Sequence, residues 1–439
     1  MSQRKNISRR EFLGKTAGIA LGAAGFPYII SSSALGKNGA VAASERITMG
    51  VVGTGGMGTV DLRGFLTFPD VRVLAVCDVE RKHREDAKGI VDSHYGNSDC
   101  AQYNDFRGLL AREDIDAVLV TTPDHWHGLV SVAAAKAGKD IYCEKPLANS
   151  IMEGRAICEA VKRYGRVLQT GSHERSNDSV RFACELVCNG RIGKLHTIRI
   201  NLPLKEPHHA EVLKNGGVQP MPIPDGFDYD MWLGHTPYEP YTERRCHFWW
   251  RFILDYGGGE ITDRGAHIID IAQLGNGSDN TGPIEIEAQG QAPAEGIYNT
   301  FMKYKFECKY ANGVRMVGGS EGTRGLKFEG SDGWVFIHIH GGNLEAEPAS
   351  LLHEVTGPNE IHLGRSCGHH RDFLNAVKTR GLTIAPAEVG HRTASICHLL
   401  NIAMLSEQKL KWDPDKEQII NSSEASRMLT RSMRSPWHL

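Results

Sequence analysis

The sequence predicts two folded domains: an N-terminal α/β domain with a parallel sheet, then an α+β domain with a large, mostly antiparallel open sheet. Short apolar runs alternate with helical patterns up to about residue 170. From Lys194 onward the hydrophobic period changes to that of strands. The chain has 439 residues, of which 41% are hydrophobic and 23% charged. This composition is ordinary for a globular protein with more than one core.

The first 43 residues are expected to be an export signal and not part of either domain. Arg9 and Arg10 precede a weakly apolar run from 16 to 35, and small residues follow at 40–42. This pattern is typical of a twin-arginine signal peptide, although a basic start to an amphipathic helix is the alternative. We therefore expect the twin-arginine export machinery as a partner. The expected location is the periplasm, free or anchored at the outer face of the inner membrane.

The charge of the chain argues against nucleic acid as a partner. Removal of residues 1–43 takes away six basic residues and one acidic residue, which leaves 44 basic and 51 acidic side chains. The mature chain is therefore mildly acidic, with a formal charge of −7. A nucleic-acid-binding domain is usually basic, so we expect no such partner.

A glycine-rich turn between two expected strands carries the strongest motif. The apolar strand 47–52 runs into Gly53-Thr54-Gly55-Gly56-Met57-Gly58, which opens a helix that reaches Leu66. The next strand, 71–77, is followed at once by Asp78. Strand, G-x-G-x-x-G, helix, strand and acid in this order form the dinucleotide fingerprint. We therefore expect a Rossmann domain over residues 46–170.

Each residue of the fingerprint has a physical role. Gly53 permits the tight turn, Gly55 lets a pyrophosphate approach the backbone, and Gly58 allows close packing of helix and strand. Gly56 and Met57 begin the helix, whose free N–H groups and positive dipole end attract phosphate. Asp78 is placed to bind the ribose hydroxyls, which favours NAD over NADP. Arg81 nearby leaves NADP as the less favoured alternative.

The rest of the first domain follows the same alternation. We expect strands at 117–120, 140–143 and 167–170, with helices at 127–137 and 151–164. Six strands are expected in all, five of them at the ranges given, and they would form an open parallel sheet. Ligands of such sheets bind at the carboxyl ends of the strands.

Two of these carboxyl ends carry polar side chains. One strand leads into Thr121-Thr122-Pro123-Asp124-His125-Trp126-His127, and another leads into Glu144-Lys145-Pro146. A proline after a strand is common by itself. A lysine at a strand end beside a cofactor crevice is less common, so we expect Lys145 to contact the cofactor or the reacting group. A surface lysine is the alternative.

The second domain, residues 171–420, is expected to be rich in strands. Its expected strands are 195–201, 284–289, 302–310, 314–318, 326–328 and 334–339, with helices at 371–378 and 393–405. One face of this sheet is expected to cover the cofactor crevice. The tail, 421–439, is polar and is expected to pack on the surface.

A second candidate motif lies in the glycine-rich stretch from Gly257 to Asp270. Asp263, His267 and Asp270 are spaced i, i+4 and i+7, which places them on one helical face. The functional interpretation is an active-site face. The structural interpretation is that Asp263 or Thr262 caps the helix and His267 is a core histidine. The spacing alone leaves both open.

Together these motifs resemble the Gfo/Idh/MocA oxidoreductase family over essentially the whole chain after the signal. The resemblance rests on Gly53–Gly58, Asp78, Thr122-Pro123 with His127, Glu144-Lys145-Pro146 and Asp263-Arg264-Gly265-Ala266-His267. The order of the last two motifs, after a dinucleotide fingerprint, is specific. The resemblance implies that Thr122, Pro123, His127, Glu144 and Lys145 belong to the NAD site.

The resemblance also implies catalytic roles. Lys145 would hold and polarise the reacting oxygen, Asp263 would orient the substrate, and His267 would act as general base. Histidine suits this role because its ordinary pKa is ~6.5, and a lysine cation stabilises a developing alkoxide. Many members have a glutamine where this chain has His173, so the contact beside the nicotinamide departs from the family pattern.

Further side chains are weaker candidates. His173, Arg175, Trp249 and Arg251 are expected to contact substrate, because aromatic and charged groups suit sugar rings. Trp232 and Trp250 are further candidates for stacking on sugar rings, and core packing is an equal alternative for two of these three tryptophans. His208-His209, Cys246-His247 and the Asp263/His267 pair match no strong ligand motif, so we expect no metal.

The resemblance implies an oxidoreductase that acts on a secondary hydroxyl of a sugar, polyol or glycoside. Free NAD is scarce outside the cytoplasm, so an exported enzyme is expected to hold its cofactor tightly. One alternative is a redox-neutral glycoside hydrolase, in which transient oxidation allows elimination and hydride then returns. A remote alternative is a non-catalytic sugar-binding protein. A homo-oligomer is expected from the family alone.

Overall fold

The computed structural model describes residues 41–214 and 218–439, so the expected twin-arginine motif lies outside the described residues. The chain divides into two units at Arg46. In the first, a short 3-10 helix spans Ala43–Glu45, and the Arg46 guanidinium donates to the carbonyl of Val41 at 2.7 Å. The second unit, 47–439, contains both sheets.

The first sheet has six parallel strands and confirms the predicted open parallel sheet of a Rossmann domain. Their spatial order is β3-β2-β1-β4-β5-β6, the arrangement typical of dinucleotide-binding domains. The strands are β1 (Ile47–Val52), β2 (Val71–Cys77), β3 (Ala101–Tyr103), β4 (Ala117–Val120), β5 (Asp140–Cys143) and β6 (Leu168–Thr170). β4 and β5 are buried along their whole length, as their continuous apolar runs predict.

Helices connect these strands on both sides of the sheet. They are α2 (Gly56–Leu66), α3 (Arg81–Tyr95), α4 (Phe106–Leu110), α5 (Asp124–Lys136) and α6 (Ile151–Arg163). α5 begins three residues before the prediction, directly after Pro123. α6 is capped by Ser150, whose hydroxyl accepts the backbone N–H of Glu153. These crossovers leave the carboxyl ends of β1, β4 and β5 at one edge.

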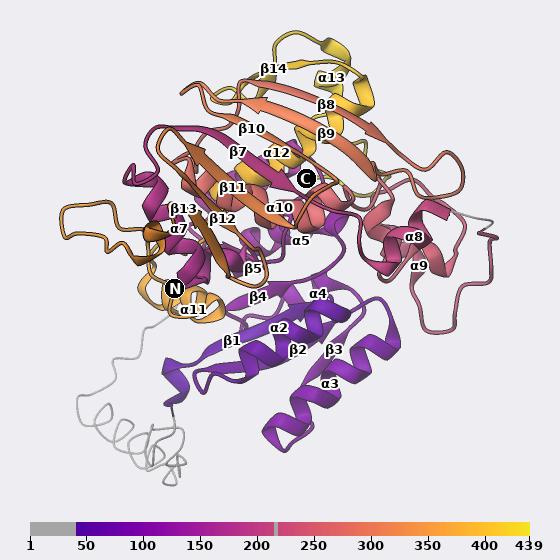
Figure 1. Ribbon diagram of the computed structural model, residues 1–439. Coiled ribbons are helices and arrows are strands. Elements are labelled where there is room, and N and C mark those ends of the chain that lie inside the picture. The colour runs from indigo at the N-terminus through magenta and orange to yellow at the C-terminus, as the bar shows by residue number, and fades with distance from the viewer. Residues whose placement is uncertain (1–40, 215–217) are drawn as a thin grey trace, which may run out of the picture. The chain divides into compact units, whose positions relative to one another are not determined.

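The second sheet has nine strands and is antiparallel except for the neighbours β7 and β10. Its order is β13-β12-β11-β7-β10-β9-β8-β14-β15. The strands are β7 (Leu195–Asn201), β8 (Glu285–Gln291), β9 (Lys303–Lys309), β10 (Arg315–Gly319), β11 (Gly325–Gly330), β12 (Trp334–Ile337), β13 (Leu344–Glu347), β14 (Leu410–Asp413) and β15 (Gln418–Ile419). Figure 1 shows this larger sheet, with β8–β13 in orange, and the purple strands of the first sheet.

Two long helices cover one face of the nine-stranded sheet. α10 (Glu260–Gly275) and α12 (Ala387–Ser406) pack against each other, and their apolar residues share a core with Phe306 and Phe328 of the sheet. Along β9, buried and exposed residues alternate strictly, so the opposite face carries polar side chains. α10 thereby presents its first turns toward the first domain.

Shorter helices fill the connections of the second domain. They are η2 (His173–Ser176), α7 (Asp178–Cys188), α8 (Pro207–Lys214), α9 (Tyr229–Leu233), η3 (Glu243–Arg245), η4 (Trp249–Phe252), η5 (Ala349–His353), α11 (His369–Thr379) and α13 (Ser423–Arg427). No helix among the described residues has the length and apolar character needed to cross a membrane.

Late parts of the chain return to the first domain. Phe373 and Leu374 of α11 are fully buried in the core of the parallel sheet, and Arg371 pairs with Asp70 at 2.7 Å. The tail, which was predicted to pack on the surface, is mostly exposed or half-buried and contacts the first domain. Trp437 lies edge-on to Trp126 of α5, with ring centroids 4.9 Å apart. The first domain is therefore completed by residues from the C-terminal part of the chain.

Candidate active site

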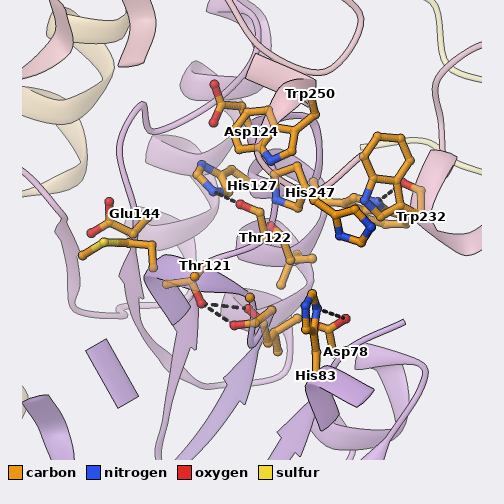
Figure 2. Close-up of a pocket in the computed structure, with 18 of the residues that line it drawn as sticks. Asp78, His83, Thr121, Thr122, Asp124, His127, Glu144, Trp232, His247 and Trp250 are labelled. Carbon is orange, nitrogen blue, oxygen red and sulfur yellow. Dashed lines mark hydrogen bonds and ion pairs between the residues drawn. The ribbon is translucent and has the colours of Figure 1, made fainter. Parts of the chain in front are cut away.

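A cleft of about 530 Å³ lies at the carboxyl edge of the parallel sheet and is lined by both domains. This volume is within the usual range for small-molecule sites. Most of the predicted site residues line it: Gly53, Gly55, Gly56, Met57, Asp78, Thr122, Pro123, His127, Glu144, Lys145, His173, Arg251, Asp263 and His267. Figure 2 shows Asp78 and His83 in one part of this pocket, with Asp124, Trp250 and Glu144 in other parts of it.

The glycine turn has the geometry that a dinucleotide needs. Gly53 has a φ of +88°, and a Cβ there would lie 2.6 Å from the backbone nitrogen of Thr122. A Cβ on Gly58 would lie 2.1 Å from the carbonyl oxygen of Gly53. By contrast, a Cβ on Gly55 would meet only His83 Cε1, at 3.9 Å, one on Gly56 would meet nothing within 4 Å, and no side chain caps the first turn of α2. The N–H groups of this turn are therefore available to phosphate, so the residues present fit NAD.

Gly58 gives a test of the turn by dinucleotide binding. We expect Gly58→Ala to weaken NAD binding by at least about tenfold, because the Cβ pushes α2 away from the turn. Gly89→Ala in α3, where a Cβ meets nothing within 4 Å, is the matched control. Titration of NAD by protein fluorescence measures both. Equal affinity in the two variants would contradict the role of Gly58 as a close-packing position.

Asp78 is held as an anion at the end of β2. Its carboxylate accepts the backbone N–H of Thr54 at 2.7 Å and that of Glu80 at 2.9 Å. Burial alone would raise the pKa of Asp78, but His83 and these N–H groups lower it below its usual value. Figure 2 marks the contact between Asp78 and His83. A fixed carboxylate suits ribose hydroxyls and repels a 2′-phosphate.

His127 connects the two strand ends that the sequence singles out. Its ring nitrogens lie 2.7 Å from the carbonyl oxygen of Pro146 and 2.9 Å from that of Thr122. Burial lowers the pKa of His127 to about 4. Thr121 donates its hydroxyl to the Gly53 carbonyl at 2.5 Å, so the glycine turn is joined to the same region. These contacts make His127 a positioning residue of the cleft.

Glu144 is a buried carboxyl group beside the turn at Gly171. A Cβ on Gly171 would lie 2.1 Å from Glu144 Oε1, so only glycine leaves room for this side chain. Burial raises the pKa of Glu144 to about 8, and the nearby Asp61 carboxylate adds to the shift. The raised pKa keeps Glu144 protonated, although the Lys145 ammonium opposes the shift, so Glu144 adds no second negative charge to the cleft at neutral pH.

Lys145 and Asp263 meet across the domain boundary. The ammonium of Lys145 donates to Asp263 Oδ1 at 2.5 Å and to the Asp263 carbonyl at 3.1 Å. Arg251 Nε lies 3.6 Å from the same carboxylate oxygen. Burial alone would raise the pKa of Asp263, but Lys145 and Arg251 hold it well below its usual value. The pair is therefore ionised, and the lysine keeps its charge.

His267 lies one turn after Asp263 on α10 and is 5% exposed. Burial, with a smaller effect from the Lys145 ammonium, lowers the pKa of His267 well below its usual value. Its Nδ1 is buried and has no hydrogen-bond partner. The structure thus places Lys145, Asp263 and His267 in one region, which favours the active-site interpretation of this helical face over the capping one. Asp270, on the same face, instead pairs with Arg175.

Two expected substrate contacts lie outside the cleft. Arg175 is buried and donates to Asp270 and Asp279, each at 2.7 Å, so it is a structural cation. Trp249 packs against Tyr298 with ring centroids 6.0 Å apart. Its neighbour Trp250 lines the cleft instead, because consecutive residues of η4 point to different sides. The prediction is wrong for Arg175 and Trp249 for these reasons.

Several lining residues were not predicted. These are Asp124, His83, His247, Arg264 and His340. Trp232 and Trp250, which were predicted with Trp249 as candidates for stacking on sugar rings, also line the cleft. Asp124 belongs to the polar segment 121–127 that follows a predicted strand, so a signal for it existed. His247 and His340 come from loops of the second domain, and no periodicity in the sequence indicates which way a loop side chain points. His340 nevertheless lies with its ring 5.0 Å from that of His267.

Two family models match the chain. A model described as "Oxidoreductase family, NAD-binding Rossmann fold" matches residues 47–172, and one described as "Oxidoreductase family, C-terminal alpha/beta domain" matches residues 198–439. Among relatives, a myo-inositol 2-dehydrogenase of Thermotoga maritima is 30% identical over 171 residues, which is 39% of this chain and 49% of the relative. A levoglucosan dehydrogenase of Pseudarthrobacter phenanthrenivorans is 28% identical over 159 residues, 35% of this chain and 40% of the relative. The chain thus spans about half the length of the curated relatives it matches.

Solved structures show the same fold. An aldose-aldose oxidoreductase from Caulobacter crescentus, complexed with glycerol, has a TM-score of 0.61 at 18% identity, and the match covers 83% of this chain and 99% of that one. A levoglucosan dehydrogenase in complex with NADH and levoglucosan has a TM-score of 0.60 at 18% identity, with the same coverage. Both domains are therefore arranged as in known oxidoreductase structures.

Proposed function

Because the chain belongs to the Gfo/Idh/MocA oxidoreductase family, we propose that it is an exported, NAD-dependent oxidoreductase that acts on a secondary hydroxyl of a sugar, polyol or glycoside. The NAD-binding family model over residues 47–172 and the open glycine turn support NAD as the cofactor. Relatives that act on myo-inositol and levoglucosan support a polyhydroxylated substrate. The paired arginines at the start of the chain support export.

The observation that carries this proposal is the 2.5 Å contact between Lys145 and Asp263 with His267 one turn away. Lys145 follows β5 of the dinucleotide-binding sheet, and Asp263 and His267 belong to α10 of the second domain. A charged donor and a base therefore stand on opposite walls of one cleft. A hydroxyl between them would be oriented by both domains.

Oxidation of an alcohol requires an acceptor for the hydroxyl proton and an acceptor for the hydride. NAD, when bound, supplies the hydride acceptor. The imidazole of His267 takes the proton as general base. The ammonium of Lys145, held in place by Asp263, stabilises negative charge on the substrate oxygen while the proton leaves. Trp250 and Arg251, with the guanidinium 4.5 Å from the ring centroid, form a wall that suits a sugar ring.

A segment of the second domain supports retention of the cofactor. Residues 225–228, which we call the clasp, contact the first domain between β2 and α3. Arg81 donates its backbone N–H to Gly226 at 2.8 Å, and Asp228 donates its own to Val79 at 3.0 Å. Phe227 of the clasp forms a bridge with Glu80 and also lines the cleft. These contacts hold Phe227 at the cleft wall near Asp78, where it would slow the release of a bound dinucleotide.

The test uses the mature chain purified without added cofactor. Mass analysis of denatured protein identifies the bound dinucleotide, and near-ultraviolet absorbance follows its reduction by myo-inositol, levoglucosan, and methyl and p-nitrophenyl glycosides. We expect bound NAD that is reduced by at least one of these compounds and stays reduced until an acceptor is added. Recovery in the periplasmic fraction, lost when Arg9 and Arg10 are both replaced by lysine, tests export.

The other outcomes are distinct. Release of nitrophenol over many turnovers without lasting reduced cofactor would replace net oxidation by the redox-neutral hydrolase. Absence of bound dinucleotide together with no response to any sugar would overturn both enzyme proposals and leave a sugar-binding protein.

A further inference from the structure

Two histidines and a buried glutamate meet at one end of the cleft. His173 and Glu174 belong to η2, and His340 follows β12, 166 residues after Glu174 in the chain. Glu174 Oε1 lies 3.4 Å from His173 Nε2 and 3.2 Å from His340 Nδ1. One ligand atom from each residue lies within 4.8 Å of those of the other two. Imidazole and carboxylate groups at such separations suit a divalent transition-metal ion.

Buried polar atoms without hydrogen-bond partners lie in and beside this cluster. Glu174 is 3% exposed, and its Oε2 is buried with no hydrogen-bond partner. Its Oε1 accepts the backbone N–H of His340 at 3.1 Å, which fixes the carboxylate. The His267 ring lies 4.5 Å from that of His173 and 5.0 Å from that of His340, and its Nδ1 also lacks a partner. Buried polar atoms without partners are uncommon and call for an explanation such as a bound ion.

The backbone at His340 is also unusual. Its φ of +69° lies in the left-handed region, which is uncommon for residues other than glycine. Gly341 and Gly342 follow it directly. The positive φ is nevertheless adopted by the histidine and not by the glycine next to it. Strained backbone conformations of this kind are concentrated at functional sites, where the side chain has a role in binding or catalysis. At this turn, the strained residue is the one whose imidazole faces Glu174.

The described residues contain two other His/Glu clusters, and neither is suited to an ion. In the cluster of His208, His209 and Glu260, the backbone N–H of Glu206 donates to His209 Nδ1, so Nε2 carries the proton that it donates to Glu260 at 2.8 Å. That nitrogen has no lone pair for a metal. The cluster of Glu80, His83 and His247 adjoins Asp78 and belongs to the expected ribose end of the NAD site.

We propose that His173, Glu174 and His340 bind one divalent transition-metal ion of the Zn²⁺ class. Three protein ligands leave at least one coordination position for an oxygen from the cleft. His173, His340 and His267 all line the cleft that contains Lys145 and Asp263. The open position would therefore bind a hydroxyl next to the reacting one, and this part of the inference rests on the proposed function.

The ion would select substrates by their hydroxyl pattern. His267 is not counted among its ligands and remains the base. A compound with two adjacent hydroxyls can give one to the ion and the other to Lys145 and His267. We therefore expect vicinal diols to be preferred over substrates with an isolated secondary alcohol.

Co²⁺ is the probe, because its visible d–d absorption reports imidazole and carboxylate ligation without any catalytic activity. The untagged mature chain is freed of metal by chelation, titrated with CoCl₂, and then challenged with ZnCl₂. We expect one Co²⁺ per chain, displaced by Zn²⁺. His340→Asn and Glu174→Gln should each weaken binding by at least about 100-fold, a loss at or above that seen when supporting groups of a metal site are removed.

The controls separate ligation from misfolding. Asparagine tolerates positive φ, so His340→Asn keeps the turn. His338→Asn removes the nearby histidine that contacts Glu345 at 2.6 Å and should bind Co²⁺ like the wild type. No Co²⁺ spectrum in the wild type, unchanged affinity in both cluster variants, or an equal loss in His338→Asn would each overturn the site.

Dinucleotide content, measured by mass on the same samples, distinguishes this inference from the proposed function. Bound NAD and sugar-dependent reduction without Co²⁺ binding would overturn the metal site alone. Co²⁺ binding that depends on His340 and Glu174, in a chain without dinucleotide or sugar response, would support the metal site and overturn the oxidoreductase.

Discussion

Replacement of Lys145 by methionine is expected to lower kcat/KM by about 10²- to 10³-fold, which is the usual effect of removing one donor to a developing oxyanion. Methionine keeps most of the side-chain length but removes the ammonium that contacts Asp263 at 2.5 Å. The chemical step should slow while the dinucleotide stays bound, because the glycine turn and Asp78 are untouched. Steady-state rates with the best substrate of the sugar panel, and mass analysis of bound NAD, measure the two effects.

Lys139 provides the matched control for this variant. Lys139 lies just before β5, whereas Lys145 lies just after that strand. The Lys139 ammonium donates to the carbonyls of Arg112 and Ile115 at 2.5 and 2.8 Å. Lys139→Met should lower the melting temperature and leave kcat/KM unchanged. If Lys145→Met also changed only the melting temperature, the lysine would be structural and the proposed reaction would lose its electrophile.

Replacement of His267 by asparagine is expected to lower kcat by about 10²- to 10⁴-fold, the usual range for loss of a general base. Asparagine is polar and fits the buried position on α10, but it cannot accept the hydroxyl proton. Bound NAD should remain, and substrate should still protect the cleft from a chemical label. A primary deuterium isotope effect on kcat that persists in the variant would show that hydride transfer still takes place, only slowly.

His391 separates loss of the base from loss of a buried histidine. It is fully buried near the start of α12, and its Nε2 lies 2.6 Å from Glu417. His391→Asn should destabilise the fold and spare kcat. A His267→Asn variant that retains wild-type kcat would contradict the proposed mechanism, whatever its stability.

The regular elements of this protein were predictable because their signals are local. β2, β4, β5 and β7 begin and end at the predicted residues, since each is an apolar or alternating run bounded by turn residues. β3 has only three residues, none of them fully buried, so no apolar run in the sequence predicts it. The parallel pairing of β7 with β10 joins segments more than 110 residues apart, and no local pattern encodes it.

The site residues were predictable only where a chemically reactive side chain stands in a recognisable sequence motif. Lys145, Asp263 and His267 stand in spacings that carry meaning by themselves. Which of Trp249 and Trp250 lines the cleft depends on how η4 is rotated about its axis. A shift of the helix by one residue would exchange their positions. Arg175 was misassigned because its partners, Asp270 and Asp279, are brought to it only by the packing of α10 against η2. Glu174 and His340 meet for the same kind of reason.

The insertion of α11 into the first domain has a consequence for biosynthesis. Phe373 and Leu374 complete the core beneath β1 and β2, and Arg371 and Lys378 neutralise Asp70 at the edge of that core. The N-terminal half of the chain therefore leaves the ribosome with an unfinished hydrophobic interior. The core beneath the nucleotide site is complete only after α11 has been synthesised, so we expect the cofactor to be loaded late in biosynthesis.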